Sequence, residues 1–141
     1  MLSKAKFSSK MAFEVVQGDH KFFVDAHHEH GGENRGPSPK GLLLSGLAGC
    51  TGMDVVSILN KMHAPFDSLE ISAEADLTDD HPKVFKDIIV KYFLTGQELD
   101  LTKVKRAVDL SMEKYCGVSA MLRKNSEVLP EIYFNGVKQE I

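Results

Sequence analysis

The chain has 141 residues, of which 43% are hydrophobic and 26% are charged, and a formal net charge of -3, which is the composition of an ordinary soluble protein. Acidic and basic residues are mixed along the chain, so the basic face expected of a nucleic-acid-binding protein is missing. No Pro/Gly/Ser-rich stretch divides the sequence, and residues 1–141 are predicted to form a single domain.

The sequence gives no sign of export or of a membrane anchor. The N-terminal lysines are not followed by the apolar segment of a signal peptide. The most apolar stretch, from Leu42 to Met62, is interrupted by Gly, Ser, Thr, Asp and Asn, and we expect it to be too polar to span a membrane. A cytoplasmic location is therefore predicted, and two cysteines are too few for a disulfide scaffold.

The first half of the chain predicts two strands, a loop and a long helix. Residues 11–16 and 21–25 are predicted strands that flank a turn at 17–20, and residues 27–39 form a glycine-rich loop. Ser38 and Pro39 are a typical N-cap and first residue of a helix, which we expect to run to about Met62. This helix is apolar on nearly every side, which predicts burial. Three glycines recur in it at every third position and suggest close approach of another backbone: Gly46, Gly49 and Gly52.

The second half predicts two strands, two helices and a hairpin. The strands cover residues 69–77 and 84–94, and a helix starts near Asp100 or Thr102 with one apolar stripe. Gly117 is expected to end this helix, and Ser119 to cap a short helix at 120–124. The C-terminal segment from Ile132 turns at an Asn-Gly pair. The predicted fold class is therefore α+β, with one very apolar helix at its centre.

The two cysteines lie far apart in the sequence, Cys50 in the middle of the apolar helix and Cys116 at the end of the following one. There is no C-x-x-C motif to indicate a thioredoxin-like or zinc-knuckle site. Composition alone leaves two interpretations open: small buried core residues, or a redox pair. Asp54 and Glu113 lie near the cysteines in sequence and are expected to cap, pair or face solvent.

Two motifs resemble those of the OsmC/Ohr family of thiol peroxidases. Residues 37–56, PSPKGLLLSGLAGCTGMDVV, resemble the family's Pro-x-x-Leu-Leu-x-Ala-Leu-Ala-x-Cys helix, and residues 113–119, EKYCGVS, resemble its Cys-x-Val-Ser motif. The separation of the cysteines and the order of the predicted elements are also similar to the family pattern. The chain is therefore identified as a divergent OsmC-like member.

The resemblance implies a fold and an activity. The fold would be an intertwined homodimer in which a buried central helix packs against antiparallel sheets, with the active site at the dimer interface. Cys50 would be the peroxidatic cysteine and Cys116 the resolving one. The enzyme would reduce organic or inorganic hydroperoxides in oxidative-stress defence, with a dithiol reductant and without a cofactor or metal.

A thiol attacks a peroxide as the thiolate, and a free cysteine has a pKa of about 8.5, so the site needs a cation or a strong hydrogen-bond donor. Well-studied members use an Arg that is held by a Glu. The Glu follows the Pro that opens the central helix, where this chain has Lys40. The Arg precedes that helix, where this chain offers Arg35 and His30. Arg35, His30 and Lys40 are therefore the candidate thiolate-stabilising residues, acting within one subunit or from its partner.

Other hypotheses stay open. A cluster of imidazole and carboxylate groups at residues 25–30 could bind Zn, Ni or Cu, although its glycine-rich surroundings favour a solvated loop. The missing Glu also allows a non-catalytic or sensor protein that binds a small apolar ligand at the dimer interface. A third hypothesis, in which both cysteines only fill the core, predicts that Cys50→Ala changes stability alone.

Overall fold

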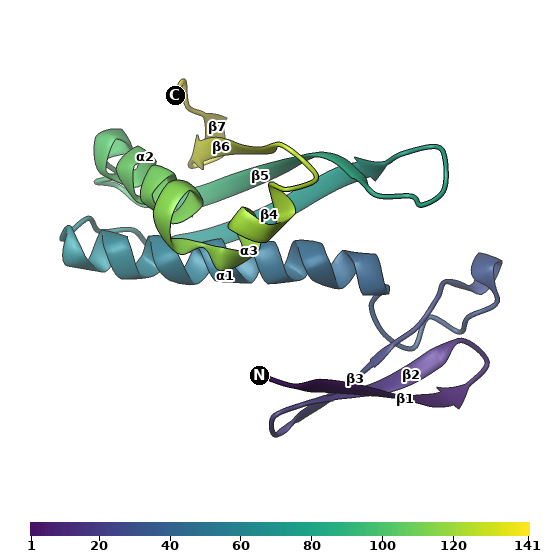
Figure 1. Ribbon diagram of the computed structural model, residues 1–141. Helices are drawn as coiled ribbons and strands as arrows, with labels where there is room; N and C mark the ends of the chain where they lie inside the picture. The colour runs from purple at the N-terminus through teal and green to yellow at the C-terminus, as the bar shows by residue number, and fades with distance from the viewer. The chain divides into compact units, whose positions relative to one another are not determined.

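The computed structural model describes residues 1–141 and has the predicted α+β composition (Figure 1). The chain divides into two compact units, residues 1–43 and residues 44–141, which are described separately below. The prediction that residues 1–141 form a single domain stays a prediction.

The first unit contains a three-stranded antiparallel sheet in the order β1-β2-β3. Its strands are β1 (Ser3–Ser9), β2 (Ala12–Gln17) and β3 (His20–Val24). The predicted turn between β2 and β3 is confirmed, and Gly18 there has a positive φ of 58°. Strand β1 was not predicted, because every one of its side chains is exposed and it lacks an alternating apolar pattern.

The glycine-rich loop after β3 is organised around the carboxylate of Asp25. The Asp25 side chain accepts hydrogen bonds from the backbone N–H groups of Ala26 at 2.7 Å, Glu33 at 3.2 Å and Arg35 at 3.1 Å. Burial raises the pKa of Asp25, but these three N–H groups outweigh burial and lower it overall. The loop, which includes the 3-10 turn η1 (His28–His30), is therefore tied to one buried acidic residue.

Helix α1 (Pro39–Lys61) begins and ends where the sequence predicts. The Ser38 hydroxyl accepts a hydrogen bond from the Gly41 N–H at 3.2 Å, as an N-cap does. After the last turn, His63 adopts a left-handed conformation with φ of 50°, which ends the helix.

Only one face of α1 is fully buried, so the expectation of burial on nearly every side is wrong for the single chain. Its buried residues recur every four positions, at Leu47, Thr51, Val55 and Leu59, because only this face packs into the core. Of the glycines, Gly52 lies close to a side chain of the second sheet, whereas a Cβ at Gly46 or Gly49 would meet nothing within 4 Å. The close approach predicted for Gly46 and Gly49 is therefore absent within one chain.

By length and composition, α1 also resembles a membrane-spanning helix, with a mean hydropathy of 1.7 in its most apolar stretch. The expectation that the segment is too polar for a span is therefore wrong on composition. One such helix is weak evidence, because the core helices of water-soluble domains pass the same test. Part of this apolar composition, including Leu47, Val55 and Leu59, packs into the core of the second unit.

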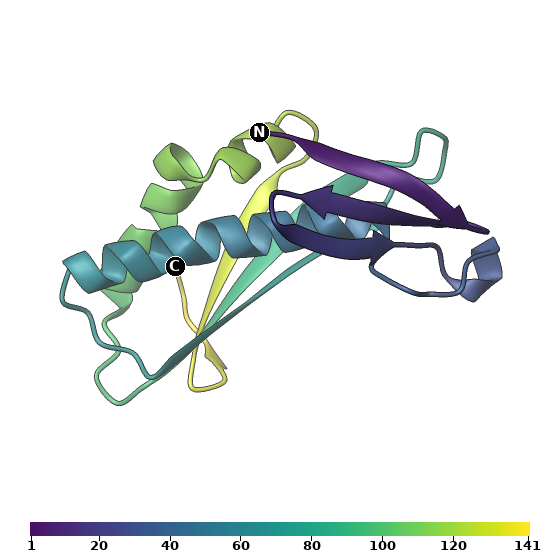
Figure 2. The same ribbon diagram turned by 90° about the horizontal axis from the view of Figure 1, so that it is seen from below.

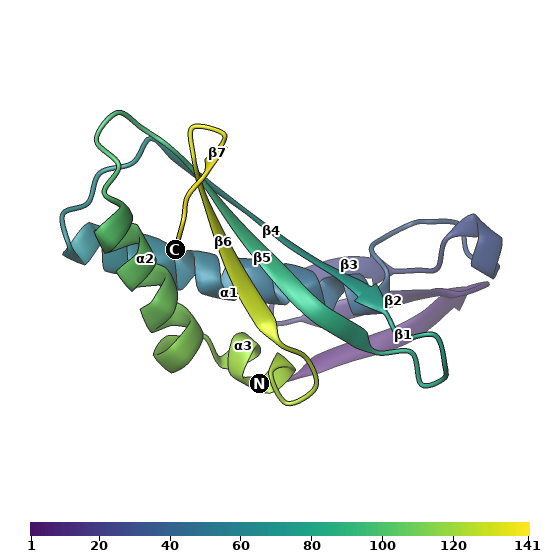
Figure 3. The ribbon, with the colours of Figure 1, turned by 90° about the horizontal axis from the view of Figure 1, so that it is seen from above.

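The second unit has a four-stranded sheet in the order β4-β5-β6-β7 (Figure 3). The strands are β4 (Ser68–Leu77), β5 (Phe85–Thr95), β6 (Val128–Phe134) and β7 (Val137–Lys138). The β4–β5 and β6–β7 pairs are antiparallel, but β5 and β6 are parallel, so the sheet is mixed rather than antiparallel as expected. The reason is the helical crossover between β5 and β6, which brings the chain back in the same direction.

The crossover contains α2 (Leu101–Leu110), a π turn η2 (Ser111–Tyr115) and α3 (Gly117–Leu122). Asp100 caps α2 by accepting from the Lys103 N–H at 3.1 Å. Figure 2 shows α1 crossing in front of the strands of the second sheet and in front of α2. Alternate β5 residues face this core and are at most 1% exposed: Ile88, Val90, Tyr92 and Leu94.

Candidate functional site

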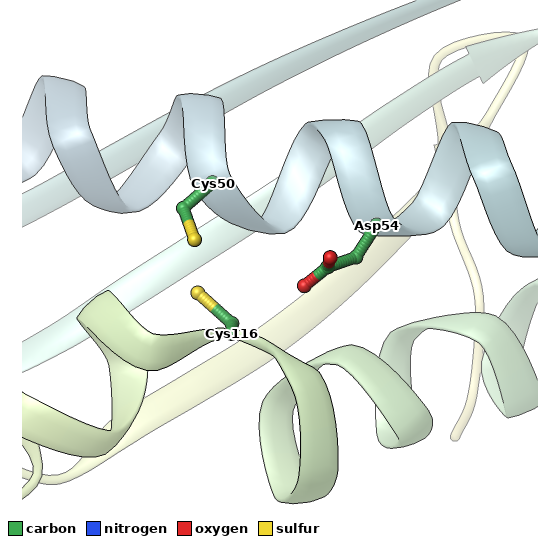
Figure 4. A group of neighbouring side chains, drawn as sticks. All are labelled: Cys50, Asp54 and Cys116. Atoms are coloured by element: carbon green, nitrogen blue, oxygen red, sulfur yellow. The ribbon is translucent and has the colours of Figure 1, made fainter.

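Cys50 and Cys116 meet in the core of the second unit (Figure 4). Both are free thiols; Cys50 is half-buried and Cys116 is 3% exposed. Their sulfur atoms and a carboxylate oxygen of Asp54 all lie within 4.8 Å of one another. The sequence predicted the cysteine pair, whereas Asp54 was expected to cap, pair or face solvent.

The end of the π turn fixes the position of Cys116. The Cys116 N–H donates to the Ser111 carbonyl at 2.8 Å, and the residue then turns to an extended conformation. Its Sγ accepts from the Ser119 N–H at 3.3 Å and so caps α3. The predicted cap, Ser119, is therefore wrong: α3 begins at Gly117, and the Ser119 hydroxyl instead donates to the Met112 sulfur at 3.4 Å.

Helix periodicity brings Asp54 to the thiols. Residues four apart in a helix lie on the same face, so Cys50 and Asp54 point together toward Cys116 (Figure 4). This spacing was readable from the sequence. The sequence did not show that the last turn before α3 faces the same part of α1.

A buried hydrogen-bond chain holds the Asp54 carboxylate. Ser111 Oγ donates to Asp54 Oδ2 at 2.9 Å, Thr51 Oγ1 lies 2.8 Å from Ser111 Oγ, and the Tyr92 hydroxyl lies 2.7 Å from Thr51 Oγ1. Each hydroxyl has one hydrogen. Ser111 donates its only hydroxyl hydrogen to Asp54, so it must accept from Thr51. Thr51 in turn has no second hydrogen to donate and accepts from Tyr92. The chain therefore runs in one direction, from β5 through α1 and η2 to the carboxylate.

The environment of Cys116 favours the neutral thiol. The pKa of Cys116 is raised to about 11, mainly by burial and also by the neighbouring Cys50 and Asp54. The hydrogen bond from the Ser119 N–H acts in the opposite direction but is outweighed. Burial likewise raises the pKa of the Tyr92 hydroxyl, consistent with its role as a donor at the start of the chain.

The three candidate thiolate-stabilising residues lie in the first unit. Arg35 contacts the hydroxyls of Ser8 and Ser9 at 3.4 and 3.2 Å, and its guanidinium lies 4.2 Å from the centre of the Phe23 ring. His30 lies 3.6 Å from the Glu29 carboxylate and is exposed. Lys40 is an exposed residue in the first turn of α1. The role of Arg35, His30 and Lys40 at the thiolate stays a prediction.

The histidine-rich loop does not form a metal-ligand cluster. The carboxylate of Asp25 is occupied by backbone N–H groups, and His30 faces Glu29 at the surface. The group of three potential metal ligands that the fold brings together is instead Cys50, Asp54 and Cys116. The loop at residues 25–30 was expected to be solvated, and the sequence did not point to the group around Cys50.

Two hollows lie along α1. One of about 360 Å³ is lined by Asp54 and mainly by apolar side chains, including Ile58, Met62 and Tyr115. The other, about 680 Å³, lies between α1 and β4, where its lining includes Gly49, Met53 and Leu69. Neither cysteine lines either hollow, so the thiol site meets the smaller one only at Asp54.

The fold and the paired thiols agree with a known family. Residues 31–130 match the family model of the OsmC-like proteins, so the chain belongs to the OsmC-like protein family. It is also 38% identical over 126 residues to Protein YhfA of Escherichia coli (strain K12), a match that covers 88% of this chain and 90% of that protein.

Solved structures support the same fold. A crystal structure of a hypothetical protein from Aquifex aeolicus VF5 superimposes with a TM-score of 0.80 at 27% identity, covering 95% of this chain and 96% of that one. An organic hydroperoxide resistance protein OsmC from Legionella pneumophila superimposes with a TM-score of 0.69 at 21% identity, covering 94% and 95%. At that identity the second likeness concerns the fold alone.

Proposed function

We propose that this protein is a cysteine-based thiol peroxidase that reduces organic or inorganic hydroperoxides through a Cys50–Cys116 disulfide. The observation that carries this proposal is the convergence of two free thiols from distant parts of the sequence. The two sulfurs lie within 4.8 Å of each other, and a disulfide requires them to come to about 2.05 Å, which we expect side-chain rotation to allow.

The reaction needs a nucleophile and a resolving thiol. The Cys50 thiolate attacks one peroxide oxygen, the O–O bond breaks, and the alcohol leaves with a proton, which gives a sulfenic acid on Cys50. The Cys116 sulfur then attacks the Cys50 sulfur and displaces the hydroxyl group of the sulfenic acid. This group takes the Cys116 proton and leaves as water, and a disulfide forms. A dithiol reductant then reduces the Cys50–Cys116 disulfide to the two thiols and is itself oxidised to a disulfide.

The environments of the two cysteines support this assignment of roles. Cys50 is half-buried and borders apolar surface, so it is the more accessible sulfur for an alkyl hydroperoxide. Cys116 is buried, and its raised pKa keeps it a thiol until the sulfenic acid forms next to it. The motifs around Cys50 and Cys116 resemble those of the OsmC/Ohr family, and this resemblance favours hydroperoxides as the substrate class and a part in oxidative-stress defence.

The active assembly we propose is a cytoplasmic homodimer formed through the outer face of α1. That face carries the exposed apolar side chains of Met53, 77% exposed, and Val56, 36% exposed. Gly46 and Gly49 have open space in front of them, which suits the close approach of a second helix. A partner there would cover the apolar surface that one chain leaves in water.

The decisive experiment is the consumption of cumene hydroperoxide by the reduced protein with dihydrolipoamide as the reductant. We expect turnover by the native protein and background consumption by Cys50→Ser. Cys116→Ser is expected to react once and then stall as a sulfenic acid, which dimedone traps. A native protein that consumes no more peroxide than Cys50→Ser would contradict the peroxidase proposal.

A second candidate function is a sensor or binding protein for a small apolar ligand. The apolar hollow of about 680 Å³ along α1 favours it. This candidate predicts that an apolar ligand binds equally well to the native protein and to Cys50→Ser. Peroxide turnover that depends on Cys50 would decide against it.

A further inference from the structure

The thiol site combines three groups that bind metal ions. Cys50 and Asp54 lie four residues apart on one face of α1, and Cys116 faces them from the turn before α3 (Figure 4). Their ligand atoms lie within 4.8 Å of one another. We propose that Cys50, Asp54 and Cys116 form a binding site for a thiophilic divalent cation, Zn²⁺ above all, with a fourth coordination position open to water or an external thiol.

The distances suit a tetrahedral ion. With Zn–S bonds of about 2.3 Å and a Zn–O bond of about 2.1 Å, neighbouring ligand atoms in a tetrahedral site are about 3.6–3.8 Å apart. The ligand atoms here, all within 4.8 Å, reach that spacing by small side-chain rotations. The backbone of α1 and of the turn before α3 therefore needs no rearrangement.

The ligand set selects among metals. Two sulfur ligands favour Zn²⁺ over Mg²⁺ or Ca²⁺, which prefer oxygen, and the carboxylate favours Zn²⁺ over Cu⁺. Three protein ligands leave one position free, as in open zinc sites. Binding releases the proton of each thiol that coordinates, and no electron is transferred.

Hydrogen bonds behind the ligands already orient two of them. Ser111 donates to Asp54 Oδ2, which leaves Oδ1 without this hydrogen bond and available as the metal ligand. The Ser119 N–H donates to the Cys116 sulfur and fixes its side-chain direction. Such outer contacts usually hold metal ligands in place, and their loss weakens binding about 10- to 100-fold.

Metal and disulfide exclude each other at this site. A metal ion binds cysteine as the anionic thiolate, and the sulfurs of a disulfide are neutral and poor ligands, so Zn²⁺ binds only the reduced form. If the proposed peroxidase activity holds as well, bound Zn²⁺ inhibits it, because a coordinated sulfur is not free to attack a peroxide. The binding itself does not rest on peroxide reduction.

The test is titration of the fully reduced, oxygen-free protein with Zn²⁺ in competition with a chromophoric chelator, and with Co²⁺ as a spectroscopic probe. We expect about one Zn²⁺ per chain and a thiolate-to-cobalt charge-transfer band. Cys50→Ser and Cys116→Ser should abolish the band, and Asp54→Asn should weaken Zn²⁺ binding by at least about tenfold.

Two matched controls locate the site. Asp109→Asn removes a carboxylate of α2 that pairs with Lys105, and it should leave binding unchanged. The double variant His28→Ala/His30→Ala should also bind normally. Loss of binding in the histidine variant, with retention in both cysteine variants, would place the metal in the loop and overturn the proposal.

Oxidation of the native protein tests the same point without a mutation. Diamide forms the disulfide without any peroxide, and we expect it to release bound Zn²⁺, with binding restored by dithiothreitol. Failure to bind stoichiometric Zn²⁺, or retention of Zn²⁺ by the disulfide form, overturns this proposal. A protein that binds Zn²⁺ but does not turn over hydroperoxide overturns the peroxidase function only.

Discussion

At the residue scale, the two cysteines differ in their surroundings rather than in their chemistry. Cys116 is 3% exposed, caps α3 and lies beside both Cys50 and Asp54, whereas Cys50 is half-buried on the long helix. A buried thiol next to negative groups keeps its proton. These positions in the fold are the reason why we propose Cys50 as the attacking and Cys116 as the resolving cysteine.

The raised pKa of Cys116 gives a pH-dependent prediction. In the native protein the pKa of the Cys116 thiol is raised to about 11. In Cys50→Ser we expect the midpoint of Cys116 ionisation to fall below that value but to stay above the ordinary cysteine value. The midpoint shifts down because Cys50 no longer contributes, and it stays raised because burial is the largest cause. The pH dependence of alkylation by iodoacetamide measures it. A midpoint below pH 8 would contradict the burial argument.

The same shift has a defined effect on stability. A pKa that is higher in the folded than in the unfolded chain stabilises the folded state below the unfolded pKa, and this contribution is lost as pH rises through the folded pKa. The native protein should therefore lose stability, relative to Cys116→Ser, between about pH 9 and pH 11.

At the element scale, three segments are joined by one line of hydroxyl groups. Tyr92 of β5, Thr51 of α1 and Ser111 of η2 form a directed chain of hydrogen bonds that ends at Asp54. The first three are 0% exposed, so none of them has water as an alternative partner. The chain therefore fixes the register of α1 against β5 and against the π turn that presents Cys116.

Thr51→Val tests this chain, because it keeps the shape of the side chain and removes the hydroxyl. Tyr92 then loses its acceptor and Ser111 its donor, and the free energy of unfolding should fall by about 1–3 kcal/mol. Urea unfolding measures the change. Thr102→Val, at an exposed position of α2, is the matched control.

A partial rescue distinguishes the hydrogen bonds from simple packing. Tyr92→Phe added to Thr51→Val removes the hydroxyl that has lost its acceptor, so the double variant should be more stable than the sum of the single changes. Additive losses, or a loss in Thr51→Val no larger than in Thr102→Val, would show that the chain contributes little.

At the scale of the whole molecule, α1 is buried on one face and exposes apolar groups on another. Leu47, Val55 and Leu59 have no exposed surface, while Met53 is 77% exposed. Covering the second face would remove its apolar side chains from water and so stabilise the helix. Residues 44–141 alone do not provide that cover, which is why we propose a homodimer.

Met53→Glu is expected to weaken the homodimer, because it would bury a charge against the partner's apolar face. Sedimentation velocity should show a dissociation constant raised by about tenfold or more, equal to at least about 1.4 kcal/mol. Met121→Glu changes an exposed methionine of α3 rather than of α1, and it should leave the association state unchanged. A native protein that is monomeric at micromolar concentrations would contradict the homodimer.

The sequence by itself determined most local structure and the family. Ser38 and Pro39 marked the start of α1, the Asn-Gly pair marked the last hairpin, and the motifs around Cys50 and Cys116 identified the OsmC-like family. These signals are local, since caps, turns and periodicity depend on a few neighbouring residues. Strand β1 was not predicted from the sequence, because its side chains are all exposed and show no periodic apolar pattern.

Only the tertiary structure decided which distant groups meet. The parallel pairing of β5 and β6, the capping of α3 by Cys116 and the place of Asp54 beside both sulfurs all follow from the helical crossover. Sequence separation sets no distance between such groups, because their approach depends on how the helices pack against the sheet. Cys50 and Cys116 were identifiable from the sequence, but the third member of their site and the hydroxyl chain behind it were not.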